Sequence, residues 1–382
     1  MTEVSVVSCP SYEPAVCRRA LEAVLAPIGG LGFVTPGMRV IIKANLVSAM
    51  KPDRAATTHP ALLCALTEML RERGASVVIG DSPGGLYTAA YVGAVYRVTG
   101  IDEAEACGAV LNRDFSQATA SFPEAAVAHS FQYTRYLDDA DAIIDFCKLK
   151  THGMMGMSAA AKNLFGVIPG TMKPEYHFRY PDQRDFARMI VDLNEYFKPR
   201  LCIVDAVVGM DGNGPTAGDP RPIGALLAGL SPHKTDLACA SLIGLSREDV
   251  PTLEAARERG LIPESADQLE IAGNLSEFAP EEFHNVGVHN GHLFTDKLPG
   301  ALGLLQSKTL NFFLSARPGV RRQECVGCRK CEQICPAHAI TMKKGKPSID
   351  RSKCIRCFCC QEFCPKGAMK VRRTPVAKLL NR

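Results

Sequence analysis

Short apolar runs alternate with amphipathic stretches along the first three hundred residues of the chain. The apolar runs have the length and the Val and Ile content of buried parallel strands. They span Val4–Val7, Arg39–Ile42, Ser76–Ile79, Ala142–Phe146 and Leu201–Val204. Helices are expected at Pro14–Leu25, Pro60–Arg73 and Asp182–Phe197, followed by a strand at Gly224–Ala228 and a helix at Thr235–Ile243. This alternation predicts a layered α/β domain with a mainly parallel sheet over residues 1–300.

Polar residues follow the predicted strands, and ligands of open α/β sheets bind just beyond the carboxyl ends of the strands. Between Lys150 and Asn163, small residues would let backbone N–H groups approach a ligand, and a helix starting near Ser158 would present its positive end to an anion. Lysines would hold a carboxylate or phosphate there, and His152 or Asp81 would manage protons. The candidate catalytic residues are Lys43, Asp81, Lys150, His152 and Lys162. The alternative is an ordinary capped helix flanked by surface lysines.

Other polar residues leave two interpretations open. Asp205, Asp211 and Asn213 have the oxygen ligands that a divalent cation prefers, but their glycine-rich surroundings equally suit a tight turn. His59 precedes Pro60 and is a candidate helix cap, and Asp236 is expected either to face the pocket or to cap a helix. No Walker loop is present and no GxGxxG follows a strand, so no flavin or nicotinamide fingerprint is seen.

Several of these segments together resemble a known family, the domain of unknown function 362, over about residues 4–290. The segments are Lys43–Leu46, Thr57–Pro60, Asp81–Gly84, Lys150–His152, Lys162–Gly166, Asp205 and Asp211–Thr216. Members of that family often carry a two-cluster ferredoxin module, which implies an iron–sulfur protein of redox type. The resemblance implies no particular substrate or reaction.

Eight cysteines near the end of the chain fall into two copies of the run C-x2-C-x2-C-x3-C-P, offset by 29 residues. Such a duplicated run holds two [4Fe–4S] clusters, with the fourth cysteine of each run serving the other cluster. Cluster one is therefore assigned to Cys325, Cys328, Cys331 and Cys364, and cluster two to Cys354, Cys357, Cys360 and Cys335. The alternatives are a zinc ribbon or a disulfide framework, but zinc sites usually show two separated CxxC pairs and disulfides do not fit a reducing cytosol.

This segment, residues 323–371, resembles the bacterial two-cluster ferredoxins. A hairpin is expected from Ala339–Met342 to Lys346–Ile349, linking the two halves. Cys359 has no counterpart in the first copy and is predicted to be a packed free thiol rather than a ligand. Residues 301–322 are expected to form a helical linker, and residues 372–382 a basic tail.

The 382 residues have an ordinary hydrophobic share of 46% and no apolar stretch of membrane-spanning length. No signal-like N-terminus is seen, which predicts a cytoplasmic protein whose scattered cysteines outside the cluster runs are buried thiols. From residue 315 onward, 17 Lys and Arg face 4 Asp and Glu. This charge indicates either counter-charge for the clusters or a docking face for an acidic electron donor or acceptor of ferredoxin or flavodoxin type. A nucleic-acid partner is not indicated, since no recognition motif accompanies the charge.

The leading hypothesis is an iron–sulfur oxidoreductase that passes single electrons through two [4Fe–4S] clusters to a small anionic substrate at the strand-end pocket. The rival is a non-enzymatic electron carrier or redox sensor whose α/β domain binds another protein. A third hypothesis is a ligand- or metal-binding domain with purely structural clusters. A concave cavity beside a cluster would favour catalysis over the carrier.

Overall fold

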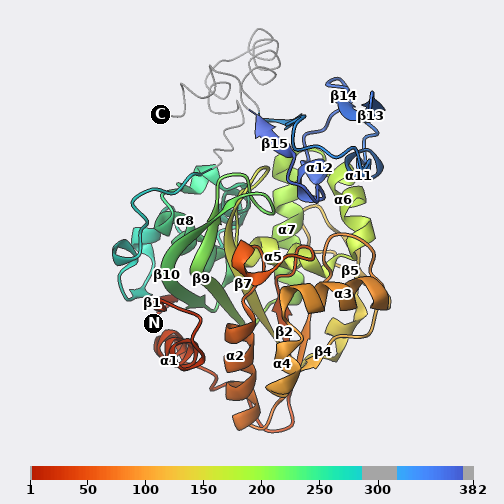
Figure 1. Ribbon diagram of the computed structural model, residues 1–382. Helices are drawn as coiled ribbons and strands as arrows, with labels where there is room; N and C mark the ends of the chain where they lie inside the picture. The colour runs from red at the N-terminus through yellow and green to blue at the C-terminus, as the bar shows by residue number, and fades with distance from the viewer. Residues whose placement is uncertain (1, 286–315, 373–382) are drawn as a thin grey trace.

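A large mixed sheet organises the N-terminal part of the molecule, the α/β domain (Figure 1). The computed structural model describes residues 2–285 and 316–372. Within these residues the sheet has nine strands, in the order β11-β1-β10-β9-β7-β2-β3-β4, with β8 added beside β7. The strands are β1 Val4–Ser8, β2 Arg39–Ala44, β3 Ser76–Gly80, β4 Val110–Leu111, β7 Ala142–His152, β8 Gly156–Ser158, β9 Leu201–Asp211, β10 Asp219–Gly229 and β11 Ile271–Ala272. A separate hairpin consists of β5 Gln117–Ser121 and β6 Ser130–Thr134.

The centre of the sheet is parallel, as the sequence predicts: β9, β7, β2, β3 and β4 pair in parallel in that order. The predicted strand at Val4–Val7 is present, but it pairs antiparallel with β10 and only briefly in parallel with β11. Strand β10 in turn runs antiparallel to β9. The α/β fold with a mainly parallel sheet is confirmed, and one side of the sheet is antiparallel.

Helices cover both faces of the sheet, because successive side chains of a strand point to opposite faces. Ile42 belongs to the hydrophobic core under the first group of helices, whereas its neighbour Ile41 belongs to the core on the other face. The first group comprises α1 Pro14–Leu25, α2 Pro60–Glu72, α3 Ala89–Thr99 and α4 Glu103–Ala106. The second comprises α5 Ala160–Asn163, α6 Lys173–Arg179, α7 Gln183–Phe197, α8 Pro232–Leu242 and α9 Pro251–Glu258. The result is a three-layer sandwich.

Two central strands are longer than their apolar runs indicate. Strand β7 continues from the predicted end at Phe146 to His152, and all eleven of its residues are buried. Strand β9 likewise continues past Val204 to Asp211. Polar residues that were expected in loops after these strands therefore lie within the sheet, where burial requires each of them to have a partner.

The helix starts are specified by local side chains. His59 caps α2, because its Nδ1 accepts a hydrogen bond from Ala61 N at 3.2 Å, and Asp182 caps α7. The short helix α5 is capped from a distance: Asp236 on α8 accepts hydrogen bonds from the N–H groups of Ala160 and Ala161. The expectation that this helix start is open to an anionic ligand is therefore wrong, since a carboxylate already occupies it.

The C-terminal domain, residues 316–372, repeats its backbone every 29 residues. Strand β12 Arg317–Val320 corresponds to β14 Lys346–Ile349, and β13 Ile340–Lys343 corresponds to β15 Met369–Arg372. Helix α11 Lys330–Gln333 corresponds in the same way to α12 Cys359–Glu362. The repeat pairs β12 with β15 and β13 with β14, so the expected hairpin is present.

The backbone conformation also repeats. The left-handed positions Gly327, Arg329 and His338 recur 29 residues later as Arg356, Phe358 and Gly367. The expected helical linker lies mostly outside the described residues, but its last part forms strand β12 instead of a helix. The expected basic tail lies outside them from residue 373 onward. No helix of the described ranges is long and apolar enough to cross a membrane.

Candidate functional site

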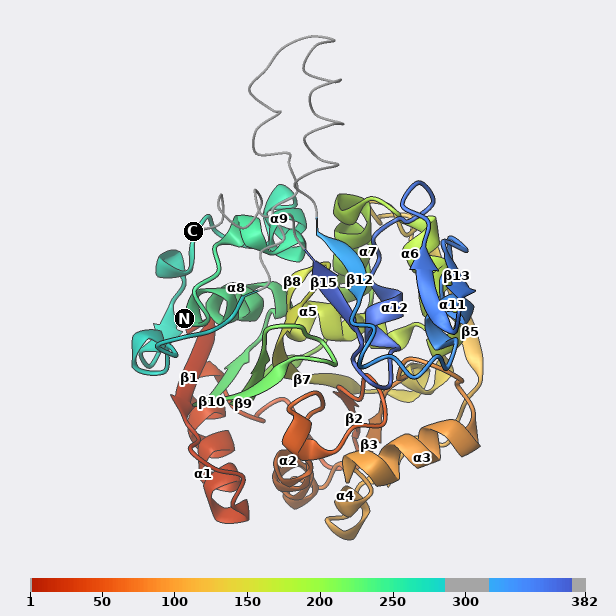
Figure 2. The same cartoon turned by 45° about the horizontal axis from the view of Figure 1, so that its top comes forward.

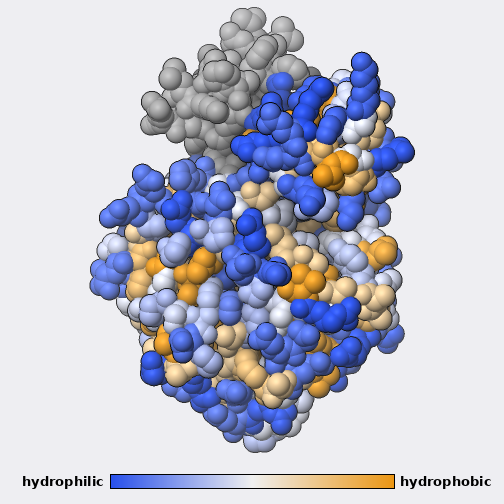
Figure 3. Space-filling view, in the orientation of Figure 1, coloured by the Kyte–Doolittle hydropathy of each residue, from blue (hydrophilic) through white to orange (hydrophobic). Residues whose placement is uncertain are grey.

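The C-terminal domain packs against the α/β domain where β7 ends (Figure 2). Gln361 Nε2 donates hydrogen bonds to the carbonyl oxygens of Asn213 and Gly214, at 3.0 and 2.9 Å. The N–H of Val371 donates to Asn213 Oδ1 at 3.0 Å. In the space-filling view, the visible face of the C-terminal domain is mostly hydrophilic (Figure 3).

Two glycines permit this close packing. A Cβ atom at Gly84 would lie 2.8 Å from the ring of Phe363, and one at Gly153 would lie 2.8 Å from Val371. Real Cβ atoms essentially never approach so closely, so a larger residue at either position would push the domains apart.

A cavity of about 1170 Å³ lies between the two domains. Its walls include Asp81, Lys150, His152 and Lys162 of the α/β domain and Cys364 of the C-terminal domain. Four of the five predicted catalytic residues are thus brought together. Seven Lys and Arg line this cavity against three Asp and Glu, which favours a negatively charged ligand: Arg54, Lys150, Lys162, Lys173, Lys330, Lys366 and Lys370 against Asp81, Asp219 and Glu362.

Lys43, the fifth predicted residue, does not line the cavity. Its side chain is completely buried, and its Nζ lies 2.7 Å from Asp81 Oδ1 and 3.2 Å from Asn163 Oδ1. Gly166 covers this ion pair so closely that a Cβ there would collide with both charged groups. Lys43 therefore holds Asp81 in place and cannot touch a ligand in the cavity directly.

Asp81 is also held by backbone donors. Its carboxylate accepts hydrogen bonds from the N–H groups of Leu46 and Ser82, both at 2.8 Å. With the ammonium of Lys43 added, its oxygens are occupied and its side chain is almost fully buried. This environment suits a fixed carboxylate better than a group that exchanges protons with a ligand.

The three lysines of the α/β domain at the cavity have no carboxylate partner among the described residues. Lys150 Nζ donates to Asn45 Oδ1 at 2.5 Å and to Ala56 O at 2.6 Å. Lys173 Nζ donates to the carbonyl oxygens of Ser82 and Ile168. Lys162 Nζ lies 4.6 Å above the centre of the Phe165 ring, a cation–π contact.

Burial acts on these ammonium groups. It lowers the pKa of Lys150 and of Lys173 to about 7, and it also lowers the pKa of Lys162. Charge without a counter-ion is costly at a desolvated site, and a bound anion would relieve the cost. Lys173 has no special signal in the sequence, which explains why it is missing from the predicted set.

His152 has a fixed orientation at the cavity wall. Its Nδ1 accepts hydrogen bonds from the N–H groups of Met154 and Met155, at 3.1 and 3.2 Å. The proton of the neutral ring must therefore sit on Nε2, which lies 3.1 Å from Glu362 Oε1 on α12. Burial lowers the pKa of His152, so the neutral form is favoured.

Glu362 is the second residue that sequence reasoning missed. Burial alone would raise the pKa of its carboxyl group, but the contact with His152 and the charge of Lys162 outweigh burial and lower this pKa to about 2. A signal was present in the repeat: the second copy has Gln361, Glu362 and Phe363 where the first has Glu332, Gln333 and Ile334. The two copies thus differ at the positions where the second copy contacts the α/β domain.

The predicted cation ligands do not converge. Asp205 is buried and pairs with Lys148, 2.5 Å away, and also accepts from Tyr12. Asp211 pairs with Arg221 at 2.9 Å, and the side chain of Asn213 bonds to β15. Each group has its own partners, so the interpretation as a tight turn with a docking role is favoured over a cation site.

The eight repeat cysteines gather in two sets. Cys325, Cys328, Cys331 and Cys364 line one cavity. Cys354 and Cys360 are electrostatic neighbours of Cys335 and Cys357. The sulfurs of the two CP positions are equivalent: Cys335 Sγ accepts from Ala339 N at 3.3 Å and Cys364 Sγ from Ala368 N at 3.2 Å. Four sulfurs around one cavity, with backbone donors aimed at the sulfur, are the donor set that an iron–sulfur cluster needs.

Cys359 is buried on α12, beside these sets but outside the period of the repeat. Outside the repeats, Cys64 and Cys107 form a disulfide, contrary to the expectation of free thiols. The remaining cysteines of the α/β domain, Cys9, Cys17, Cys147, Cys202 and Cys239, are free and buried as expected.

Comparison with known proteins adds two family matches. Residues 40–241 match the Domain of unknown function (DUF362), and residues 324–368 match the 4Fe-4S dicluster domain. Both resemblances inferred from the sequence motifs are confirmed, and the second match supports 4Fe–4S cluster binding. A thylakoid-associated protein from Synechocystis sp. is 33% identical over 269 residues, which cover 69% of this chain and 81% of that protein.

Two solved structures are also similar. The lactate racemase apoprotein from Thermoanaerobacterium thermosaccharolyticum matches with a TM-score of 0.42 and 16% identity, over 64% of this chain and 58% of its own length. A protein from Thermotoga maritima matches with a TM-score of 0.39 and 13% identity, over 66% of this chain and 60% of its own length. The matched region covers less than two thirds of either of these chains.

Proposed function

Since the chain belongs to the DUF362 family and ends in a 4Fe-4S dicluster domain, we propose that it is an iron–sulfur oxidoreductase acting on a small anionic substrate. The single observation that carries this proposal is the cavity between the domains. Its walls combine three lysines that lack carboxylate partners with Cys364, a cysteine of the repeat. The cavity thus has a binding site for an anion next to a proposed ligand of an iron–sulfur cluster.

The proposed cluster ligands follow the period of the repeat. Cys325, Cys328, Cys331 and Cys364 would hold the first cluster, and Cys354, Cys357, Cys360 and Cys335 the second. The clusters, when bound, would supply single electrons. Because Cys364 lines both the first sulfur cavity and the large cavity, the first set is the one beside the proposed substrate.

The lysines would bind and orient the substrate. Lys150 and Lys173 are held by neutral oxygen acceptors, and Lys162 stands above Phe165, so no carboxylate competes with a ligand for these ammonium groups. Fixed ammonium groups in a partly desolvated cavity stabilise both a bound carboxylate or phosphate and negative charge that develops during reduction. The ion pair between Lys43 and Asp81 would hold this wall of the cavity in place.

His152 would fix the cavity wall in one tautomer. Its neutral ring carries a proton on Nε2, the nitrogen nearest to Glu362, while Nδ1 accepts from two backbone donors and has no free lone pair for a second proton. Loss of the Nε2 proton would leave an imidazolate, so the ring would orient the substrate rather than protonate it. A reduced anion needs a proton donor within reach, and the ammonium group of Lys150, whose pKa burial lowers to about 7, is suited to that role.

An acidic electron donor or acceptor of ferredoxin or flavodoxin type would be the partner. The C-terminal domain exposes Arg329 and Lys330 directly after Cys328 in the sequence, and Cys328 is itself exposed. Positive charge around an accessible cysteine of the first set favours association with an acidic protein. A cytoplasmic location stays a prediction from the sequence.

The rival is a carrier or assembly partner without catalysis. It is favoured by the same basic surface, because a relay protein needs a docking face as much as an enzyme does. The two proposals differ at the cavity, since a carrier has no use for lysines at a cavity wall that lack carboxylate partners.

The test is reduction of the anaerobic protein with dithionite, followed by a panel of carboxylates and phosphates. An enzyme is expected to reoxidise only with its substrate, and Lys162→Met is expected to abolish that response. The exposed Lys198, changed to Met, is the matched control and should respond like the unchanged protein. Reoxidation by no compound while the iron content is complete would favour the carrier, and equal responses of the two variants would contradict the role of Lys162.

A further inference from the structure

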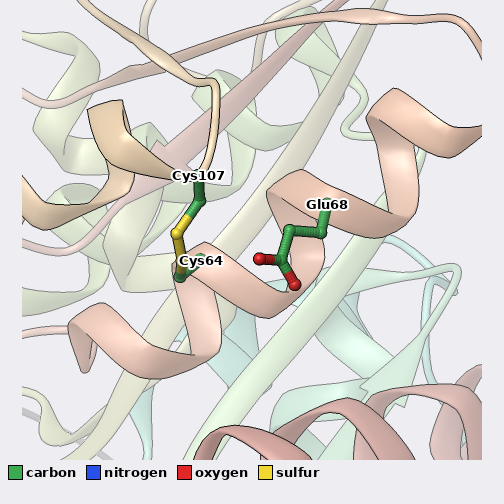
Figure 4. A group of neighbouring side chains, drawn as sticks. All are labelled: Cys64, Glu68 and Cys107. Carbon is green, nitrogen blue, oxygen red and sulfur yellow. A yellow bond between two sulfur atoms is a disulfide. The ribbon is translucent and has the colours of Figure 1, made fainter.

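A disulfide joins Cys64 and Cys107, and Figure 1 shows their helices, α2 and α4, on the side of the α/β domain opposite the C-terminal domain. Cys64 lies on α2, and Cys107 directly follows α4. Their Cα atoms are 5.5 Å apart, within the range of disulfides in proteins. Figure 4 shows the bond between the helix and the neighbouring loop, with Glu68 one turn further along α2.

The pair differs from the other cysteines of the α/β domain in its exposure. Cys64 and Cys107 are half-buried and Glu68 is exposed, whereas the free cysteines of this domain are fully buried. A thiol reagent or a reducing protein can therefore reach this bond from solvent. The proposed reaction uses neither cysteine.

The bond closes a loop that carries part of the cavity wall. Between Cys64 and Cys107 lie β3, α3 and the segment from Asp81 to Tyr91. Five residues of that segment line the large cavity, besides Asp81: Ser82, Gly84, Gly85, Leu86 and Tyr91. Tying the two ends of this loop together restricts its motion, so breaking the bond would loosen the wall.

The redox state of the compartment determines whether an accessible disulfide persists. In a reducing cytoplasm, the location expected from the sequence, an accessible disulfide is usually transient and regulatory rather than structural. We propose that Cys64 and Cys107 are a reversible thiol–disulfide exchange site for a dithiol reductant, and that their redox state sets the rigidity of the cavity wall. The exchange itself is independent of the proposed function, while its effect on the substrate rests on that function.

The exchange reaction needs no electrons from the iron–sulfur clusters. A thiolate of the dithiol reductant attacks one sulfur of the pair, the bond between Cys64 and Cys107 breaks, and a mixed disulfide forms. The second thiol of the reductant then displaces that cysteine. The reductant leaves as a disulfide, having given up two electrons and two protons, and both cysteines become thiols.

Glu68 is a positioning residue beside this bond, because its carboxylate oxygen and the two sulfurs lie within 4.8 Å of one another. A negative charge at that distance repels both the attacking and the leaving thiolate. The Glu68→Gln variant keeps the size of the side chain and removes the charge, so it should be reduced faster than the unchanged protein.

The experiment is a titration of the anaerobic holoprotein with reduced and oxidised dithiothreitol. Free thiols are alkylated at each potential and located by peptide mass spectrometry. Cys64 and Cys107 should become labelled together, in one two-electron step, and Glu68→Gln should shorten the half-time of labelling. In Cys64→Ser, Cys107 should be labelled at every potential. Amide hydrogen exchange of residues 81–91 should accelerate on reduction.

Several results would overturn the proposal. They are labelling of both cysteines in the oxidised protein, resistance of the bond to dithiothreitol until the chain unfolds, and one equivalent of zinc that is lost in Cys64→Ser. Unchanged exchange of residues 81–91 would contradict the link to the cavity wall. Iron content and sulfate affinity are measured on the same samples. Reversible labelling in a protein that binds no anion would support this site and count against the proposed function.

Discussion

His152 Nε2 and Glu362 Oε1 lie 3.1 Å apart across the boundary between the two domains. The histidine ends the longest buried strand of the sheet, and the glutamate ends a short helix of the cysteine repeat. This contact places a fixed proton of the α/β domain beside the domain expected to hold the clusters. It also means that the wall of the cavity exists only while the two domains are docked.

Replacing Glu362 by Ala should lower the free energy of unfolding by about 0.5–3 kcal/mol, since the buried Nε2 of His152 loses the carboxylate that lies 3.1 Å from it. The cost should shrink in the double variant with His152→Ala, giving a coupling energy of at least about 0.5 kcal/mol. Denaturant unfolding of the anaerobic holoprotein measures both quantities. Gln333→Ala is the matched control, because Gln333 holds the equivalent place in the first copy and is exposed. Strict additivity would show that the two side chains do not interact.

Gly84→Ala should weaken the docking of the C-terminal domain. The new Cβ would lie 2.8 Å from the ring of Phe363, and such overpacking costs about 1–3 kcal/mol. Gly93→Ala is the control: the nearest atom to its Cβ is 3.8 Å away, and in α3 the substitution should stabilise the protein by about 0.5–1 kcal/mol. Unfolding curves of the two variants should shift in opposite directions. A shared direction would argue against tight docking at Gly84.

The affinity of the cavity for a divalent anion should fall as the pH rises through about 7. Burial lowers the pKa of Lys150 and Lys173 to about 7, so both are mostly charged below that pH and mostly neutral above it. An anion binds the charged forms better, so its dissociation constant should increase by up to about tenfold per pH unit for each lysine involved. Calorimetric titration with sulfate between pH 6 and 9 measures this, because the charge of sulfate is constant there. A flat profile would show that neither lysine contacts the anion.

Lys162→Met should weaken sulfate binding about tenfold at pH 6, which corresponds to about 1.4 kcal/mol. The substitution keeps the length and the apolar stem of the side chain above Phe165 and removes only the charge. Lys198→Met, at an exposed lysine, should leave the affinity unchanged. Equal losses in both variants would indicate a general effect of net charge rather than a contact in the cavity.

The sequence predicts the layers of this fold and the positions of its main helices, because strand length, Val and Ile content and helix caps are local properties. It places Lys150 and His152 in a loop, although they lie on a strand. Their burial depends on partners far along the chain, Asn45 for the lysine and Glu362 for the histidine. Contacts between residues so far apart in the sequence leave no local sequence pattern.

The same limit explains the other differences at the site. The sequence predicts that Lys43 binds a ligand. In the folded chain its ammonium group instead forms an ion pair with Asp81. Lys173 is an unremarkable helix residue until folding brings it to Ser82 O. By contrast, Glu362 could have been singled out as a position where the two copies of the repeat differ, since Gln333 holds the equivalent place in the first copy. Comparing the copies residue by residue gives the positions at which their contacts can differ.

The assignment of the cluster ligands gives the last prediction. In an anaerobically prepared protein, Cys364→Ser should lose about half of the iron, because it removes one ligand from a set of four and leaves the other set complete. Cys335→Ser should lose the other half, as the equivalent residue of the first copy. Cys359→Ser should keep all of the iron, since Cys359 lies outside the period of the repeat although it is buried beside Cys360.

Iron analysis and electron paramagnetic resonance of the reduced protein distinguish these variants, because two interacting clusters give a broader signal than one. Loss of iron from Cys359→Ser with full retention in Cys360→Ser would shift the ligand by one residue, and the second set would then have to be reassigned around Cys359.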